Sequence, residues 1–429
     1  MPNRTPDVTA VEDRARASGA ARPRTGLGDR ARGALDSALS RAGGAVDEGV
    51  LRFMRRAMSG RARGRTAAAP VARATASRFD GAGTPGVSSP GLSSPGLSSP
   101  RFSTPGFSSP EAVAGDPRAR LVELARHYRE AGPALFAPPP EPEVTEVALA
   151  PRAGATSVVD LSFPSRFRPT WPGYLDEYAS YAANLTARAR LYRGAGSARP
   201  VLICLHGWGA GRAWLDERAF AVPYLLRIGL DVVLFQLPFH GQRAPARLRS
   251  GALFPGTNVV RTNEAFGQAV SDLRGLAGWL RGRGAPAIGA VGMSLGGYTT
   301  ALWAGLDDDL AFAGAIIPAV SMSRLFWAHG AGSPARRRAE RAGVTAELLD
   351  DAFAVHAPLE RPVRLPRERL FVAAARGDRI TPPEQAEMLW RHWGEPALVW
   401  VPGGHLTQLA RGDAFRGLRR ALSRIGLAA

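Results

Sequence analysis

The feature that most constrains this chain is a Gly-x-Ser-x-Gly motif at residues 292–296, with Ser294 at its centre. An apolar run at 287–291, typical of a buried strand, leads into the motif, and a helix-like pattern at 298–305 follows it. A sharp turn between a strand and a helix exposes a serine hydroxyl, and glycines flank it because side chains would clash there. The motif and its setting therefore predict that Ser294 is a nucleophile rather than part of a structural turn.

Two further strand patterns end in residues that can complete such a site. The apolar run 370–375 is followed by Asp378, and the run 397–401 is followed by His405. Loops at the carboxyl ends of parallel strands meet at one edge of a sheet, and the order serine, acid, histidine is that of sheet-based hydrolases. We therefore expect His405 to be the catalytic base and Asp378 to orient it.

Each partner has an alternative interpretation. The acid could come from the spare carboxylates of Asp350 and Asp351, but Asp378 alone among the three follows a strand pattern. His405 could be an ordinary loop histidine, yet the paired glycines at 403–404 directly before it favour a fixed catalytic position. The strand-end residues are therefore preferred.

A fourth strand pattern, at 201–205, leads into a His-Gly-Trp-Gly loop that starts at His206. Acyl transfer builds negative charge on the former carbonyl oxygen, and backbone N–H groups aimed at that oxygen stabilise it. The amides of Trp208 and Leu295 are the expected donors, with Gly207 as the alternative. We expect His206 to orient this loop rather than to take part in the chemistry.

With these motifs in place, the chain from about residue 144 to its end resembles the α/β-hydrolase superfamily, in its branch of esterases, lipases and dienelactone hydrolases. A Pro-Phe-His-Gly segment that begins at Pro238 looks like the Pro-Gly-His-Gly loop of many members, with Phe239 where glycine is usual. The resemblance implies an α/β fold with a mostly parallel, eight-stranded sheet and helices on both faces. It does not name a substrate, because this fold also hosts thioesterases, peptidases and acyltransferases.

The chain before the hydrolase-like region differs in composition, and we expect residues 1–117 to be a disordered, basic tail. Within it, residues 30–61 have the apolar spacing of an amphipathic helix, and residues 85–109 are five Pro/Gly/Ser-rich pentapeptides that form a linker. Such a linker cannot hold residues 1–80 in a fixed place. The tail is therefore expected to be dispensable for catalysis.

The remaining segments follow from breakers and insertions. Residues 118–143 are predicted to be a helix and a Pro-rich boundary, and residues 144–429 to be the hydrolase domain. The segment 321–369 is long for a connection between two strands, which suggests a helical lid over the site.

Composition limits the partners and the compartment. The formal net charge is +18, and all 55 basic residues are arginine. The basic tail could make weak contact with an anionic membrane surface, although a solvated tail is the simpler interpretation, and no nucleic acid is expected. No apolar leader follows Met1, which favours a cytoplasmic or membrane-peripheral protein. The single cysteine, Cys204, excludes an intramolecular disulfide.

Together these features predict a serine hydrolase that cleaves a small carboxylic ester, or a related acyl compound, through an acyl-enzyme. Neither a metal nor an organic cofactor is needed for that chemistry. An acyltransferase and a serine peptidase are alternatives on the same fold. The alternative of another class is a catalytically idle, tethered binding module, which has no need of all three triad residues.

Overall fold

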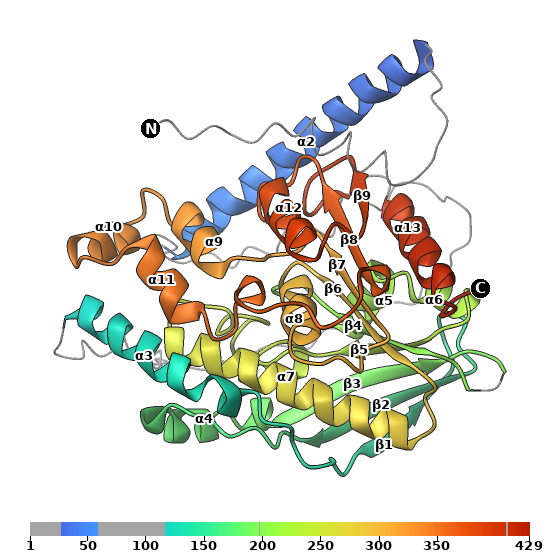
Figure 1. Cartoon of the computed structure of the whole chain (residues 1–429), viewed down its shortest axis with the longest axis horizontal. Helices are drawn as coiled ribbons and strands as arrows, with labels where there is room; N and C mark the ends of the chain where they lie inside the picture. The colour runs from blue at the N-terminus through green and yellow to red at the C-terminus, as the bar shows by residue number, and fades with distance from the viewer. Residues whose placement is uncertain (1–26, 59–115, 197, 409–410) are drawn as a thin grey trace, which may run out of the picture.

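The structure is a computed structural model that describes residues 27–58, 116–196, 198–408 and 411–429, so the pentapeptide segment 85–109 lies outside it. Within the described residues, nine strands form one sheet in the order β1-β2-β3-β5-β4-β6-β7-β8-β9 (Figure 1). The strands are β1 (Thr145–Leu149), β2 (Ser157–Pro164), β3 (Thr186–Arg193), β4 (Val201–Leu205), β5 (Asp231–Phe235), β6 (Ile288–Met293), β7 (Phe312–Ile316), β8 (Leu370–Ala375) and β9 (Ala397–Val401).

The sheet is mostly parallel. Strands β1, β2 and β3 pair antiparallel, as do β3 and β5, and every pairing from β5 to β9 is parallel. The expected count of eight strands is exceeded because Thr145–Leu149 adds an extra, largely exposed strand at one edge. Strands β4 to β8 are buried at every position, as both faces of a parallel sheet are covered by helices.

Helices cover both faces of the sheet (Figure 1). The α-helices are α2 (Leu27–Met58), α3 (Pro117–Leu135), α4 (Leu175–Ser180), α5 (Ala213–Ala219), α6 (Val222–Arg227), α7 (Val259–Gly282), α8 (Leu295–Ala304), α9 (Met322–His329), α10 (Pro334–Arg341), α11 (Ala346–Phe353), α12 (Pro383–His392) and α13 (Arg411–Arg424). Short 3-10 turns lie at Pro172–Tyr174, Ala182–Leu185, Gly241–Arg243, Pro358–Glu360 and Arg367–Arg369.

Two apolar cores hold the helices to the sheet. On one face, buried side chains of α3, α7, α8 and α12 pack against the strands. On the other face, α6 and α13 supply buried residues such as Leu225, Phe415 and Leu418. This arrangement leaves the carboxyl ends of the parallel strands free to carry the loops that the motifs occupy. No helix within the described ranges is both long enough and apolar enough to cross a membrane.

Helix α2 packs against the rest of the molecule, whereas the sequence predicts a tail that is not held in place. Its buried face consists of Gly43, Gly44, Asp47 and Leu51, and it lies against the loops that follow β8 and β9 (Figure 1). The apolar spacing that predicts the helix points elsewhere, since Leu35 and Val46 on that stripe remain 57% and 46% exposed. The helix makes its contact through glycines and a carboxylate, so hydrophobic periodicity could not identify the contact face.

Candidate active site

Ser294 lies between β6 and α8, at the turn that the motif predicts. Its backbone has φ 55° and ψ −113°, a conformation that costs a non-glycine residue roughly 1–3 kcal/mol. A Cβ on Gly292 would lie 2.0 Å from the carbonyl oxygen of Gly296, and one on Gly296 would lie 1.8 Å from that of Leu205. Both positions must be glycine because the backbone of a neighbouring segment lies where a side chain would be. The resulting turn leaves Ser294 partly accessible.

The structure brings the other two predicted residues to Ser294. Nε2 of His405 lies 3.0 Å from the Ser294 hydroxyl oxygen, and Nδ1 of His405 lies 2.7 Å from Oδ2 of Asp378. A carboxylate can only accept, so the Asp378 contact places the imidazole proton on Nδ1 and leaves Nε2 able to accept from the serine hydroxyl. Asp378 and His405 are buried, with 2% and 8% of their surfaces exposed.

The carboxylate of Asp378 is itself held by its own loop. Oδ1 accepts the backbone N–H groups of Ile380 and Thr381 at 2.9 and 2.8 Å, and Oδ2 lies 2.9 Å from the Thr381 hydroxyl. That hydroxyl is also 3.0 Å from Nδ1 of His405. Sequence reasoning did not single out Thr381, although a threonine three residues after a strand-end aspartate is a recognisable signal for such a turn.

The charge around His405 favours its protonated form. Burial acts to lower the pKa of His405, but the adjacent Asp378 carboxylate, through charge and hydrogen bond, and then the Asp47 carboxylate act in the opposite direction. The net result is a raised pKa. An imidazole in this setting is a stronger base toward a hydroxyl proton than an isolated histidine.

The expected oxyanion loop lies directly beside Ser294. A Cβ on Gly207 would be 3.4 Å from the Ser294 Cβ, so the backbone of this loop touches the serine. Leu295 is the first residue of α8, so its backbone N–H has no carbonyl partner within the helix. Trp208 keeps its indole 46% exposed and donates from Nε1 to the carbonyl of Gly251 at 2.7 Å.

His206 organises the same loop. Its Nε2 accepts the backbone N–H of Leu237 at 3.1 Å, so the ring proton resides on Nδ1, which lies 2.9 Å from the Gly207 carbonyl. The ring therefore bridges the loop after β4 to the residues that follow β5. Both ring nitrogens are engaged by backbone groups of these two loops, in keeping with an orienting role.

In the segment that begins at Pro238, Phe239 adopts a backbone conformation that favours glycine. Phe239 has φ 60°, in the left-handed region, and is 1% exposed. Its N–H donates to Oδ1 of Asn184 at 2.9 Å, and its ring meets Tyr181 edge-to-face at 5.0 Å. Burial of the aromatic ring and the hydrogen bond compensate for the unfavourable φ.

The alternative carboxylates lie in the insertion and away from the triad. Asp350 is exposed and accepts from the hydroxyl of Ser323, and Asp351 lies 3.9 Å from Arg129 on α3. The insertion itself contains α9, α10 and α11, and His329 at the end of α9 lies 2.7 Å from the carbonyl of Ile380. One end of the insertion thus contacts the loop that carries Asp378.

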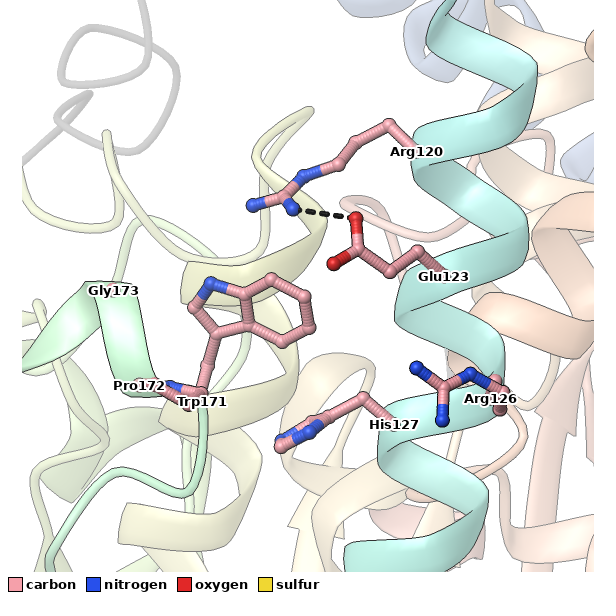
Figure 2. Close-up of a pocket in the computed structure, with 7 residues that line it drawn as sticks. All are labelled: Arg120, Glu123, Arg126, His127, Trp171, Pro172 and Gly173. Carbon is pink, nitrogen blue, oxygen red and sulfur yellow. Dashed lines mark hydrogen bonds and ion pairs between the residues drawn. The ribbon is translucent and has the colours of Figure 1, made fainter.

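A separate cavity of about 380 Å³ lies between α3 and the turn at 171–173. Arg120 pairs with Glu123 at 2.7 Å. Figure 2 shows the Arg120 side chain reaching over the Trp171 indole. None of its lining residues belongs to the triad. Among the described residues, no group of three or more His, Cys, Asp or Glu is placed to hold a metal ion.

The residue carrying the strongest unanticipated contact with the triad is Asp47 of α2. Its carboxylate lies 2.6 Å from the backbone nitrogen of His405, from which it accepts a hydrogen bond. No sequence signal marks an aspartate in an Arg-rich tail as a neighbour of a histidine 358 residues away.

Comparison with known proteins identifies the family of the chain. A family model described as "Alpha/beta hydrolase domain containing 18" matches residues 155–338. An uncharacterised protein of Mycobacterium tuberculosis strain H37Rv, Rv2627c, is 34% identical over 308 residues, which are 70% of this chain and 72% of that protein.

The similar solved structures are more distant in sequence. An acetyl xylan esterase from Paenibacillus sp. R4 is 17% identical, with a TM-score of 0.49 over 70% of this chain and 94% of its own. A puromycin-hydrolysing peptidase of Mycobacterium tuberculosis is 15% identical, with a TM-score of 0.40 over 63% of this chain and 45% of its own.

Proposed function

Because this chain belongs to the α/β-hydrolase superfamily, we propose that it is a serine hydrolase that cleaves a carboxylic ester, or a related acyl compound, of small size. One observation carries the proposal, the continuous hydrogen-bonded line from the Ser294 hydroxyl through His405 to Asp378. The three residues lie just after the carboxyl ends of β6, β8 and β9, which is where active sites form in α/β sheets.

The proposed reaction has two halves. The Ser294 oxygen attacks the carbonyl carbon of the substrate while Nε2 of His405 takes the hydroxyl proton, and the resulting oxyanion accepts from the N–H groups of Leu295 and of Trp208 or Gly207. Collapse of the tetrahedral intermediate releases the alcohol, which receives the proton from His405. Water then attacks the acyl-enzyme by the same route and regenerates Ser294.

The supporting residues have defined parts in this scheme. Asp378 keeps the His405 proton on Nδ1 and stabilises the imidazolium that forms during attack. Trp208 follows Gly207, whose backbone touches the serine, and its exposed indole offers an aromatic surface to a substrate. An acyl-enzyme with these parts needs no further group for ester cleavage.

A fluorophosphonate probe tests the proposal, because it reacts only with a serine activated by a base and an oxyanion site. We expect the wild-type protein to be labelled at Ser294 and the Ser294→Ala variant to be unlabelled. A panel of p-nitrophenyl esters of increasing acyl length, run beside peptide p-nitroanilides and alcohol acceptors, then separates an esterase from a peptidase and an acyltransferase. Equal labelling of wild type and variant would contradict the assignment of Ser294.

A further inference from the structure

The carboxylate of Asp47 joins the two loops that carry the acid and the base. Its Oδ2 accepts the backbone N–H of His405 at 2.6 Å and that of Arg379 at 3.1 Å, and its Oδ1 accepts the N–H of Leu406 at 3.1 Å. Asp47 is fully buried. Three hydrogen bonds to a buried carboxylate form a strong, oriented contact, since each is charge-assisted.

Helix α2 reaches these loops because both sides of the contact are glycine. A Cβ on Gly43 would lie 2.1 Å from the backbone nitrogen of Gly404, and one on Gly44 would lie 2.9 Å from the carbonyl oxygen of Gly377. In return, a Cβ on Gly404 would lie 2.5 Å from Oδ2 of Asp47. The glycines that precede Asp378 and His405 therefore admit the helix as well as shaping their own loops.

From these contacts we infer that Asp47 is a positioning residue of the hydrolase site, and that α2 is a strap that fixes the loops of Asp378 and His405 relative to each other. The inference rests on the function proposed above. Asp47 touches no reacting atom. It acts through the backbone of His405, whose ring must stay within hydrogen-bond reach of both Ser294 and Asp378.

The charged groups that face His405 come from two elements. Asp378 approaches its ring from the loop after β8, and Asp47 approaches its backbone from α2, while the side chain of Arg379 runs along α2 at Gly44. Both carboxylates raise the pKa of His405. Removing the Asp47 charge should therefore move that pKa downward, an effect that a purely mechanical support would not produce.

The test compares two pairs of full-length variants. Asp47→Asn and Glu48→Gln each remove one carboxylate from the same turn of α2, but only Asp47 bonds the loops. Gly43→Ala and Gly49→Ala make the same change in helix propensity, but only a Cβ at 43 meets the loop, since nothing lies within 4 Å of one at 49. Ester turnover, the rate of fluorophosphonate labelling, circular dichroism and an NMR titration of His405 are measured for each.

We expect Asp47→Asn and Gly43→Ala to lower kcat by about tenfold or more with KM changed less than about twofold, because a small displacement of a catalytic group costs that much. Glu48→Gln and Gly49→Ala should match the wild type. The NMR titration should show a lower pKa for His405 in Asp47→Asn than in the wild type. If Asp47→Asn does not fold, Gly43→Ala decides, because it replaces no side chain of the site and acts only by pushing on the loop at Gly404.

Wild-type kcat and an unchanged His405 titration in Asp47→Asn, or wild-type kcat in Gly43→Ala, would overturn the inference. Failure of the proposed function looks different. A wild-type protein that no fluorophosphonate labels would refute the hydrolase, whereas the His405 titration reports the Asp47 contact without any turnover.

Discussion

At the scale of single residues, the site combines groups whose types are visible in the sequence with contacts that are not. Ser294, Asp378 and His405 each follow a strand and stand in a turn that constrains them. Thr381 adds a hydroxyl within 3.0 Å of both the carboxylate and the imidazole. The position of the Asp378 carboxylate is thus set by its own loop, and under the proposed function turnover depends on how firmly the His405 ring is held.

The Asp378→Asn variant should lower turnover by about 10³ to 10⁴ with little change in stability, because an amide in place of the carboxylate no longer enforces the Nδ1 proton or stabilises the imidazolium. Asp350→Asn and Asp351→Asn are the matched controls, as both side chains are exposed, and both should stay near wild-type turnover. Ester kinetics and urea unfolding of the three variants check this. If a carboxylate at 350 or 351 proved essential instead, the catalytic acid would have to be assigned to the insertion and not to Asp378.

At the scale of elements, the turn from β6 to α8 shows why part of the site is predictable. Gly292 and Gly296 must lack side chains for the strand and helix to meet at Ser294, and the same requirement leaves a readable motif in the sequence. Strand ends at 375 and 401 are equally readable because apolar runs stop there. Local constraints of this kind are written in neighbouring residues.

The contact of α2 is not local and leaves no such pattern. Its buried face is two glycines, an aspartate and one leucine, whereas its apolar stripe stays largely exposed. Periodicity can predict that a helix exists near 30–61, and it cannot say which loops the helix meets after more than 300 residues of chain. The left-handed Phe239 is similar, because its burial against Tyr181 and its hydrogen bond to Asn184 are non-local contacts that explain a conformation the usual glycine would take freely.

Close approach at the turn can be tested with alanine. In Gly296→Ala, the new Cβ would lie 1.8 Å from the carbonyl oxygen of Leu205, so β4 and α8 must separate. We expect a loss of about 1–3 kcal/mol or more in the free energy of unfolding and no fluorophosphonate labelling. Gly278→Ala is the control, since an exposed position of α7 with nothing within 4 Å of the new Cβ should gain up to about 1 kcal/mol. Urea unfolding of both proteins decides, and equal stability would refute the argument.

At the scale of the whole molecule, buried histidines couple the fold to pH in opposite directions. Burial, with Arg361 as the next cause, lowers the pKa of His356 to about 3, and its ring lies 2.7 Å from the Tyr298 hydroxyl and 3.1 Å from Oδ1 of Asn263. Burial also lowers the pKa of His240, followed in effect by the charge of His206. The raised pKa of His405 acts in the opposite sense. Its contribution is present below about pH 6.5 and is lost as the pH rises through the folded value.

The sign for His356 follows from linkage. Its folded pKa lies below its unfolded value, so the unfolded chain binds an extra proton between about pH 6.5 and pH 3, and the stabilising contribution is complete above that range and lost within it. Each pH unit in the range removes up to about 1.4 kcal/mol from the free energy of unfolding.

Urea unfolding at pH 7.5 and pH 5.0 should therefore show a fall in the free energy of unfolding that is larger in the wild type than in His356→Gln, by up to about 2 kcal/mol. Because the wild type and His356→Gln both contain His240 and His405, the contributions of these two residues cancel in the comparison. Parallel losses of stability in the two proteins would mean that His356 does not titrate differently on unfolding, and that acid sensitivity arises elsewhere in the chain.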